Sequence, residues 1–155
     1  LIDEAALAKV EEHVADAKNH GGEVILGGHP HELGGLFYEP TVIKNANDEM
    51  LVSYEETFGP VAPLFSFSTE EEVIERANNT PFGLASYFYT RDLAKSWRVS
   101  EQLEYGIVGL NTGIVSTEMA PFGGVKESGM GREGSKYGID DYLEIKYISL
   151  AGIEE

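Results

Sequence analysis

The stretch PFGGVKESGMGREG, residues 121–134, says more about the fold of this chain than any other part of the sequence. The stretch is rich in both glycine and charged residues, a composition that neither a packed helix nor a plain strand would have. Glycine permits positive φ angles and close approach of the backbone to a neighbour. We therefore predict a tightly folded loop beside a functional site.

Size and composition around this loop indicate a globular protein. The 155 residues, 42% of them hydrophobic, are enough for one domain with a core. No segment approaches the roughly 20 apolar residues that a bilayer span needs, and the start of the chain lacks a secretory pattern. We expect a cytoplasmic protein without a membrane partner. Because the chain begins with leucine, we expect a processed product or a fragment.

Charge and cysteine content exclude several kinds of chemistry. The net charge of −16, from 27 acidic and 11 basic residues, argues against nucleic acid as a partner, because a phosphate backbone attracts a basic surface. The absence of cysteine excludes disulfides, thiolate metal sites and a cysteine nucleophile within these residues. His29 and His31 flank a proline, but no further ligand has metal-site spacing, so we expect no metal.

Hydrophobic periodicity and capping signals predict an α/β fold, with strands alternating with helices. One helix is expected to begin after Asp3 and to stop at the glycine pair 21–22. A capping box at 69–72 opens a second helix, and Asp92 caps a third. Pro63 favours an edge position for its strand. The expected strands and extended segments are 23–26, 37–43, 61–67, 85–90, 106–110 and 142–150.

Three motifs resemble sequence blocks of the aldehyde dehydrogenase superfamily, and they occur in the family's order. They are EETFGPV at 55–61, NTPFGLA at 79–85 and the loop at 121–133. The resemblance extends over essentially the whole chain, and the tail 131–147 is especially similar to succinate-semialdehyde dehydrogenases.

The resemblance implies the C-terminal part of that fold. Residues 1–140 are then the end of the catalytic domain with a short return into the coenzyme domain. Residues 141–155 are the oligomerisation strand and tail of a homo-oligomer. The catalytic cysteine, the glutamate that activates water and the oxyanion asparagine would lie in a missing N-terminal part of the same protein, which is therefore an expected partner.

The first motif, by this resemblance, binds the coenzyme NAD or NADP. Glu56 matches the glutamate that holds the hydroxyls of the nicotinamide ribose, for which its two acceptor oxygens are suited. Phe58 matches the aromatic that orients the nicotinamide. Lys9 matches a lysine near the adenosine ribose. The residues alone leave open a solvated glutamate at 56 and a core aromatic at 58.

The third motif and the residues just before it are expected, again by resemblance, to bind the substrate. Ser116 matches a serine that donates to the distal carboxylate of a semialdehyde, and Phe122 is expected to line the aldehyde channel. Glu133 matches a glutamate on a proton path. The alternatives are a loop serine without a partner and a Glu133 that caps or pairs with Lys136.

A subunit contact is expected at Arg132, with Glu144 as its partner. The parent protein would oxidise succinate semialdehyde to succinate with NAD or NADP, and the isolated chain would be inactive without the cysteine. Alternatives are a dehydrogenase for another small aldehyde such as glutarate semialdehyde, or a non-enzymatic oligomerisation fragment. The spacing of Gly129, Gly131 and Gly134 also fits a dinucleotide motif, but no clear strand precedes it.

Overall fold

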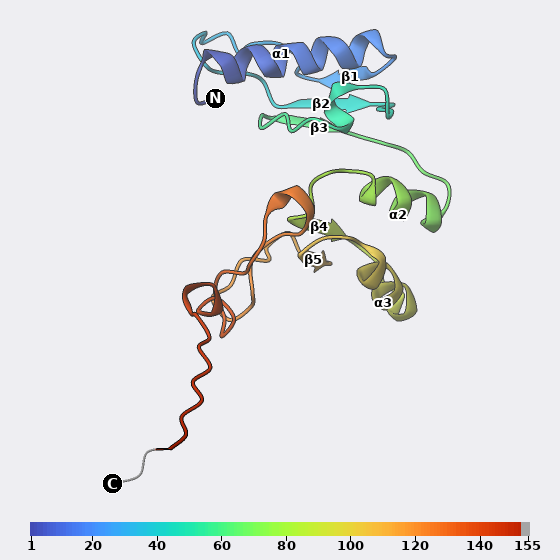
Figure 1. Cartoon of the computed structure of the whole chain (residues 1–155). Helices are drawn as coiled ribbons and strands as arrows, with labels where there is room; N and C mark the ends of the chain where they lie inside the picture. The colour runs from blue at the N-terminus through green and yellow to red at the C-terminus, as the bar shows by residue number, and fades with distance from the viewer. Residues whose placement is uncertain (153–155) are drawn as a thin grey trace. The chain divides into compact units, whose positions relative to one another are not determined.

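A computed structural model describes residues 1–152 of the chain (Figure 1). The chain divides into two compact units, Leu1–Val73 and Ile74–Glu155. Helices and strands alternate in the second unit, as the sequence predicts, whereas in the first unit one helix is followed by three strands of a single sheet. None of the helices within residues 1–152 has the length and apolarity to cross a membrane.

The first unit is a helix packed on a small mixed sheet, with the strands in the order β1-β2-β3 (Figure 1). Strand β1 is antiparallel to β2, and β2 is parallel to β3. The elements are α1 (Glu4–Asn19), β1 (Glu23–Leu26), β2 (Thr41–Lys44) and β3 (Val61–Pro63).

Local signals explain where α1 begins and which face it buries. The Asp3 carboxylate accepts a hydrogen bond from the Ala6 amide at 2.8 Å, which satisfies one of the free donors of the first turn. Val10, Val14 and Ala17 follow at helical spacing and are buried. They form the core together with Ile43 of β2 and with Met50, which follows β2 in the chain, and both of these side chains are fully buried. Each large apolar side chain buried in this way contributes about 1.5–3 kcal/mol.

The second unit is built on β4 (Ala85–Phe88), which pairs in parallel with β5 (Ile107–Leu110). The connection between them is α3 (Leu93–Gln102), whose first turn is capped by Asp92 accepting from Lys95 N at 3.0 Å. Before β4 comes α2 (Glu70–Asn78), which spans the division between the units.

Helix α2 begins with the predicted capping box. The Thr69 hydroxyl accepts from the Glu72 amide at 3.1 Å, and the Glu72 carboxylate accepts in return from the Ser68 amide at 2.8 Å. The two bonds satisfy donors that the helix cannot satisfy itself.

The glycine-rich stretch 121–134 folds as the predicted tight loop. It contains a short 3-10 turn, Lys126–Ser128, and a two-residue bridge between Phe122 and Glu133. Gly129, with a φ of 122°, ends the turn in a conformation that residues with a Cβ rarely adopt.

Several predicted strands differ from the structure. The segment expected over 37–43 forms a strand only from Thr41, and the strand expected over 85–90 ends at Phe88. The strand expected over 61–67 is paired only over Val61–Pro63, after which Leu64 keeps backbone hydrogen bonds to Ile43 and Ala46. The segment 142–150 begins in a 3-10 turn, Asp140–Tyr142, and pairs with no strand within the part of the chain described. The oligomerisation strand and tail proposed for 141–155 stay a prediction, and residues 153–155 lie outside the described residues.

Candidate functional site

The first motif is fastened to α1 by a buried histidine. The His13 side chain is 1% exposed, and its Nδ1 lies 2.9 Å from the Thr57 hydroxyl. Its Nε2 lies 3.5 Å from a Glu55 carboxylate oxygen, and Lys9 Nζ lies 3.7 Å from the same oxygen. One face of the helix therefore holds two residues of the motif through polar contacts.

Two further contacts fix the ends of the segment 51–59 on the same helix. Asp16 accepts a hydrogen bond from the Leu51 amide at 2.7 Å. At the other end Gly59 lies so close to Val10 that a Cβ on the glycine would overlap the valine Cγ2. A glycine is therefore required at 59 for close approach, whatever its backbone conformation.

Glu56 and Phe58 are left facing solvent from this anchored loop. Phe58 is 81% exposed and has a φ of 47°, an uncommon angle for an aromatic residue. Glu56 is exposed, and within residues 1–152 its carboxylate makes no hydrogen bond or ion pair. A carboxylate offers two acceptor oxygens and an exposed ring offers a flat apolar surface, so this pair has the chemistry to hold a ribose and a neighbouring aromatic ring. The alternative of Phe58 as a core residue is wrong.

Lys9 is brought to the same loop, although its partner is Glu55 rather than Glu56. The two side chains are 41% and 46% exposed, so this ion pair contributes little to stability by itself. The ion pair places the Lys9 side chain beside the motif, so that this cation and the exposed Glu56 lie on one surface of the first unit.

The predicted substrate residues lie on adjoining segments of the second unit. The backbones of Phe122 and Glu133 exchange hydrogen bonds of 2.9 and 2.7 Å, and Ser135 N donates to Glu118 O at 2.9 Å. Ser116 is exposed two residues before that second contact. Phe122 is half-buried and Glu133 is exposed, so the three predicted residues belong to one pair of adjoining loops.

Glu133 borders a cleft of about 400 Å³ lined by residues 132–135, 138, 139, 141 and 142. The alternative in which it pairs with Lys136 does not occur, because Lys136 Nζ lies 5.0 Å from the centroid of the Tyr137 ring and makes no ion pair with Glu133 within the described residues. Glu133 therefore lines the cleft without an ion pair to Lys136.

The Arg132 side chain makes its hydrogen bonds within the glycine-rich loop. Its Nη1 donates to Gly124 O and to Gly131 O, both at 2.7 Å, and its amide donates to Asp141 Oδ2 at 3.3 Å. These bonds hold the two sides of the glycine-rich loop together. Within residues 1–152 there is no ion pair between Arg132 and Glu144, so a contact between them in a homo-oligomer stays a prediction.

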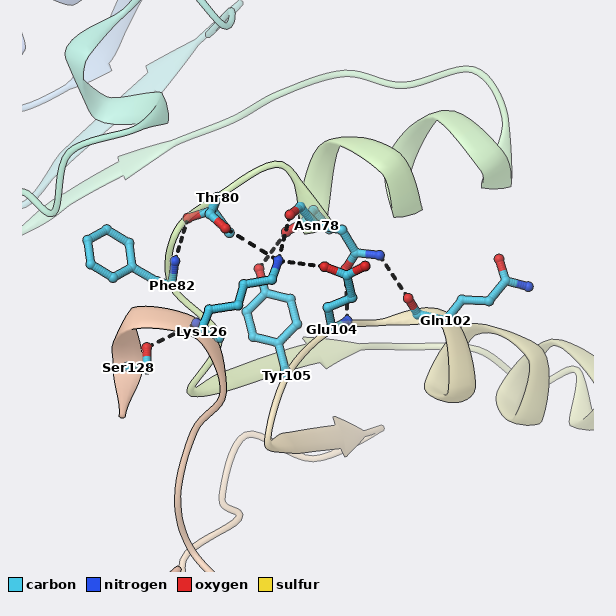
Figure 2. Close-up of polar contacts among 10 residues, drawn as sticks. Asn78, Thr80, Phe82, Gln102, Glu104, Tyr105, Lys126 and Ser128 are labelled. Atoms are coloured by element: carbon cyan, nitrogen blue, oxygen red, sulfur yellow. Dashed lines mark hydrogen bonds and ion pairs between the residues drawn. The ribbon is translucent and has the colours of Figure 1, made fainter. Parts of the chain in front are cut away.

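Lys126, to which no sequence motif assigned a role, joins three segments (Figure 2). Its Nζ donates to Asn78 O at 2.7 Å and to Thr80 O at 3.3 Å, and it forms an ion pair of 2.7 Å with Glu104. A lysine at the carbonyl end of a helix satisfies free acceptors and complements the helix dipole. The sequence offered one signal, a lysine in the glycine-rich loop with no evident role. Its partner could not be predicted, because 48 positions separate Lys126 from Asn78.

Other bonds around Lys126 complete the end of α2 (Figure 2). Asn78 donates from Nδ2 to Gln102 O at 2.8 Å and accepts at Oδ1 from Glu104 N at 2.9 Å. The Tyr105 hydroxyl donates to Ala77 O at 2.6 Å. Burial raises the pKa of Tyr105, Lys126 opposes that shift and Glu104 adds to it.

The second and third motifs meet at Gly83. Its carbonyl accepts from Gly106 N at 2.9 Å and from Val125 N at 3.0 Å, and its amide donates to the Ser128 hydroxyl at 3.0 Å. The PFG turn at 81–83 and the glycine-rich loop are thus one hydrogen-bonded assembly. It supports the segment that carries Phe122 and, across the bridge, Glu133.

Comparison with known proteins identifies the class to which these loops belong. The sequence profile of the aldehyde dehydrogenase family matches residues 1–148, and the chain therefore belongs to that family. It is 64% identical to the glutarate-semialdehyde dehydrogenase of Pseudomonas aeruginosa over 99% of the chain and 32% of that protein. It is 63% identical to the NADP(+) succinate-semialdehyde dehydrogenase GabD of Escherichia coli K12, over 97% of the chain and 31% of that protein.

Solved structures agree with this assignment. The crystal structure of succinate-semialdehyde dehydrogenase from Burkholderia pseudomallei matches with a TM-score of 0.93 and 59% identity, over 96% of this chain and 31% of that one. An NAD+ complex of an aldehyde dehydrogenase from Bacillus cereus matches with a TM-score of 0.89 and 38% identity, over 94% of this chain and 30% of that one. The chain therefore has part of the aldehyde dehydrogenase fold.

One expectation is corrected by these matches. The resemblance of the motifs implied the C-terminal portion of the enzyme, and that placement is wrong. The matches give family membership over residues 1–148 and about a third of each relative's length, with no assignment to the C-terminal portion.

Proposed function

We propose that this chain is part of an NAD(P)-dependent dehydrogenase that oxidises succinate semialdehyde to succinate. One observation carries the proposal: the loop 55–59 is anchored to α1 while it leaves the Glu56 carboxylate and the Phe58 ring exposed. A strained, exposed aromatic beside an unpaired carboxylate points to a ligand. The names of the relatives supply the class of reaction.

The coenzyme-binding roles belong to the first unit. Glu56 accepts hydrogen bonds from the two hydroxyls of the nicotinamide ribose, and Phe58 packs near the nicotinamide. Lys9 lies on the adenosine side. NAD or NADP, when bound, supplies the acceptor for the two electrons that leave the aldehyde.

The substrate roles belong to the second unit. The Ser116 hydroxyl donates to the distal carboxylate of the semialdehyde, Phe122 lines the aldehyde channel, and Glu133 passes a proton to water. Thiol chemistry on the aldehyde requires a cysteine, and these 155 residues contain none. The remainder of the protein therefore supplies the nucleophile, and the chain alone is inactive.

Self-association is the second part of the proposal. The segment 143–150 is unpaired within the described residues and exposes apolar side chains, with Ile145 100% and Tyr147 88% exposed. An unpaired extended segment is a template for pairing with another chain. We assign Arg132 and Glu144 to the same contact. A cytoplasmic location stays a prediction.

A second candidate substrate is glutarate semialdehyde, which has one more methylene. The 64% identity to a protein named for that substrate favours it. Both candidates share an aldehyde at one end and a carboxylate at the other, so Ser116 has the same role in each.

The test compares acids with uncharged aldehydes in the whole protein that contains this chain. Succinate semialdehyde is matched with butanal, and glutarate semialdehyde with pentanal, by initial rates of coenzyme reduction. A charge-assisted hydrogen bond predicts a kcat/KM about ten-fold or more higher for the semialdehydes. Ser116→Ala should remove most of this preference, whereas Ser116→Thr, which keeps the hydroxyl, should retain it. Equal kcat/KM for butanal and succinate semialdehyde would contradict the proposal.

A further inference from the structure

His13 is a buried titratable side chain to which the proposed reaction gives no role. It is 1% exposed and lies on the face of α1 that meets the first motif. Burial of a polar ring costs free energy unless both nitrogens find partners. Its partners are Thr57 at 2.9 Å from Nδ1 and Glu55 at 3.5 Å from Nε2, and both belong to the motif.

The chemistry of the two partners orders the ring. An ionised carboxylate only accepts hydrogen bonds, so the Glu55 carboxylate favours the tautomer that carries its proton on Nε2. Nδ1 then accepts from the Thr57 hydroxyl. The 2.9 Å contact with Thr57 is the hydrogen bond of this buried ring, and loss of the Thr57 hydroxyl would take that partner from Nδ1.

The position of Thr57 gives this contact its consequence. Thr57 stands between Glu56 and Phe58, the two residues proposed to hold the coenzyme. Phe58 has a φ of 47°, and such a conformation persists only where the surroundings determine it. The Asp16–Leu51 bond and the Val10–Gly59 packing fix the ends of the segment, and the His13–Thr57 bond fixes its middle.

We infer that His13 is a positioning residue that holds the coenzyme loop 55–59 in its binding conformation through Thr57. This inference rests on the proposed function. His13 touches neither coenzyme nor substrate, and it acts by fixing the direction of Glu56 and Phe58. Loss of the contact should weaken coenzyme binding and leave the chemical step nearly unchanged.

The experiment measures the dissociation constants of NADH and NADPH by their fluorescence, together with KM for the coenzyme and kcat, in the whole protein. Thr57→Val removes the hydroxyl at constant shape, and Thr57→Ser keeps it. His13→Leu removes both ring contacts. Glu56→Gln tests the proposed function separately, and His29→Gln, at an exposed histidine in a loop, is the matched control.

Thr57→Val should raise the dissociation constant about five-fold, the effect of one lost hydrogen bond, and His13→Leu, which also loses the Glu55 contact, should raise it at least as much. In both variants kcat should stay close to that of the unmodified protein. Thr57→Ser and His29→Gln should bind normally. Because Thr57 acts through its contact with His13, the double variant should be no weaker than His13→Leu alone, rather than weaker by a further factor of about five. If His13→Leu does not fold, Thr57→Val decides the matter.

Normal coenzyme binding by Thr57→Val, together with weakened binding by Glu56→Gln, would overturn the positioning role and leave the proposed function intact. Normal binding by Glu56→Gln would instead remove the proposed ribose contact. Independent effects of the two changes in the double variant would also count against a shared contact.

Discussion

Replacement of Lys126 by methionine tests whether one cation ties together the second unit. Lys126 Nζ donates to Asn78 O and Thr80 O, and hydrogen bonds from a charged donor contribute about 1.5–3 kcal/mol. The ion pair with Glu104 adds at most about 1 kcal/mol, because the Glu104 side chain is 58% exposed. Methionine keeps much of the apolar stem and the Cβ at a φ of 55°. Both bonds are exposed and the bond to Thr80 O is long at 3.3 Å, so we count a single bond near the low end of this range and expect a loss of about 2 kcal/mol in the free energy of unfolding.

The chain provides its own reporter for this measurement. Trp97 is the single tryptophan, and it lies on α3 in the same unit as Lys126. Urea unfolding followed by its fluorescence should show a midpoint about 1 M lower for Lys126→Met, with an unchanged slope. Lys136→Met, which removes an exposed lysine over the Tyr137 ring, should change the free energy by less than about 0.5 kcal/mol. A Lys126→Met midpoint equal to that of the unmodified chain would refute the reasoning.

Three other outcomes follow from the structure. Asp3→Ala removes the cap of α1 and should lower the free energy of unfolding by about 1 kcal/mol in the same titration, followed by circular dichroism; Asp3→Asn should cost much less. In Gly106→Ala the added Cβ would overlap the carbonyl oxygen of Gly123, so we expect a lower melting temperature than for the unmodified chain. An equal melting temperature would contradict the close approach of these two backbone segments. Burial raises the pKa of Tyr38 and of Tyr105 above the ordinary value of 10.0. A raised pKa in the folded state contributes stability that is fully present below the pKa of the unfolded state. Stability should therefore fall as the pH rises through and beyond about 10, and ultraviolet titration should show two tyrosines that ionise above the ordinary tyrosine pKa.

Local chemistry explains why much of the fold was predictable from the sequence. The caps at Asp3 and Asp92 act over three residues, and both bonds are present in the structure. The strand Glu23–Leu26 has the predicted bounds. The strand expected over 61–67 was too long, because its pairing depends on backbone contacts with distant residues such as Ile43 and Ala46, which the sequence of 61–67 does not contain.

The site was predictable only as separate motifs. The sequence indicated a loop at 121–134 and functional residues at Glu56 and Phe58, but not what holds them. The His13–Thr57 contact joins residues 44 positions apart, and the Lys126–Asn78 contact joins residues 48 positions apart. Such contacts depend on how the helices pack, and a buried histidine or a loop lysine has no local pattern that reveals its partner. The exposure of Phe58 likewise depends on the anchoring of its loop rather than on its hydrophobicity.

The most direct test of the account is coenzyme reduction by the purified 155-residue chain at saturating succinate semialdehyde, with NAD+ and with NADP+. The account predicts no turnover by the chain and clear turnover by the whole protein under the same conditions, because the thiol nucleophile lies outside these residues. Turnover by the chain that resists a thiol reagent would contradict it, since catalysis would then need no cysteine.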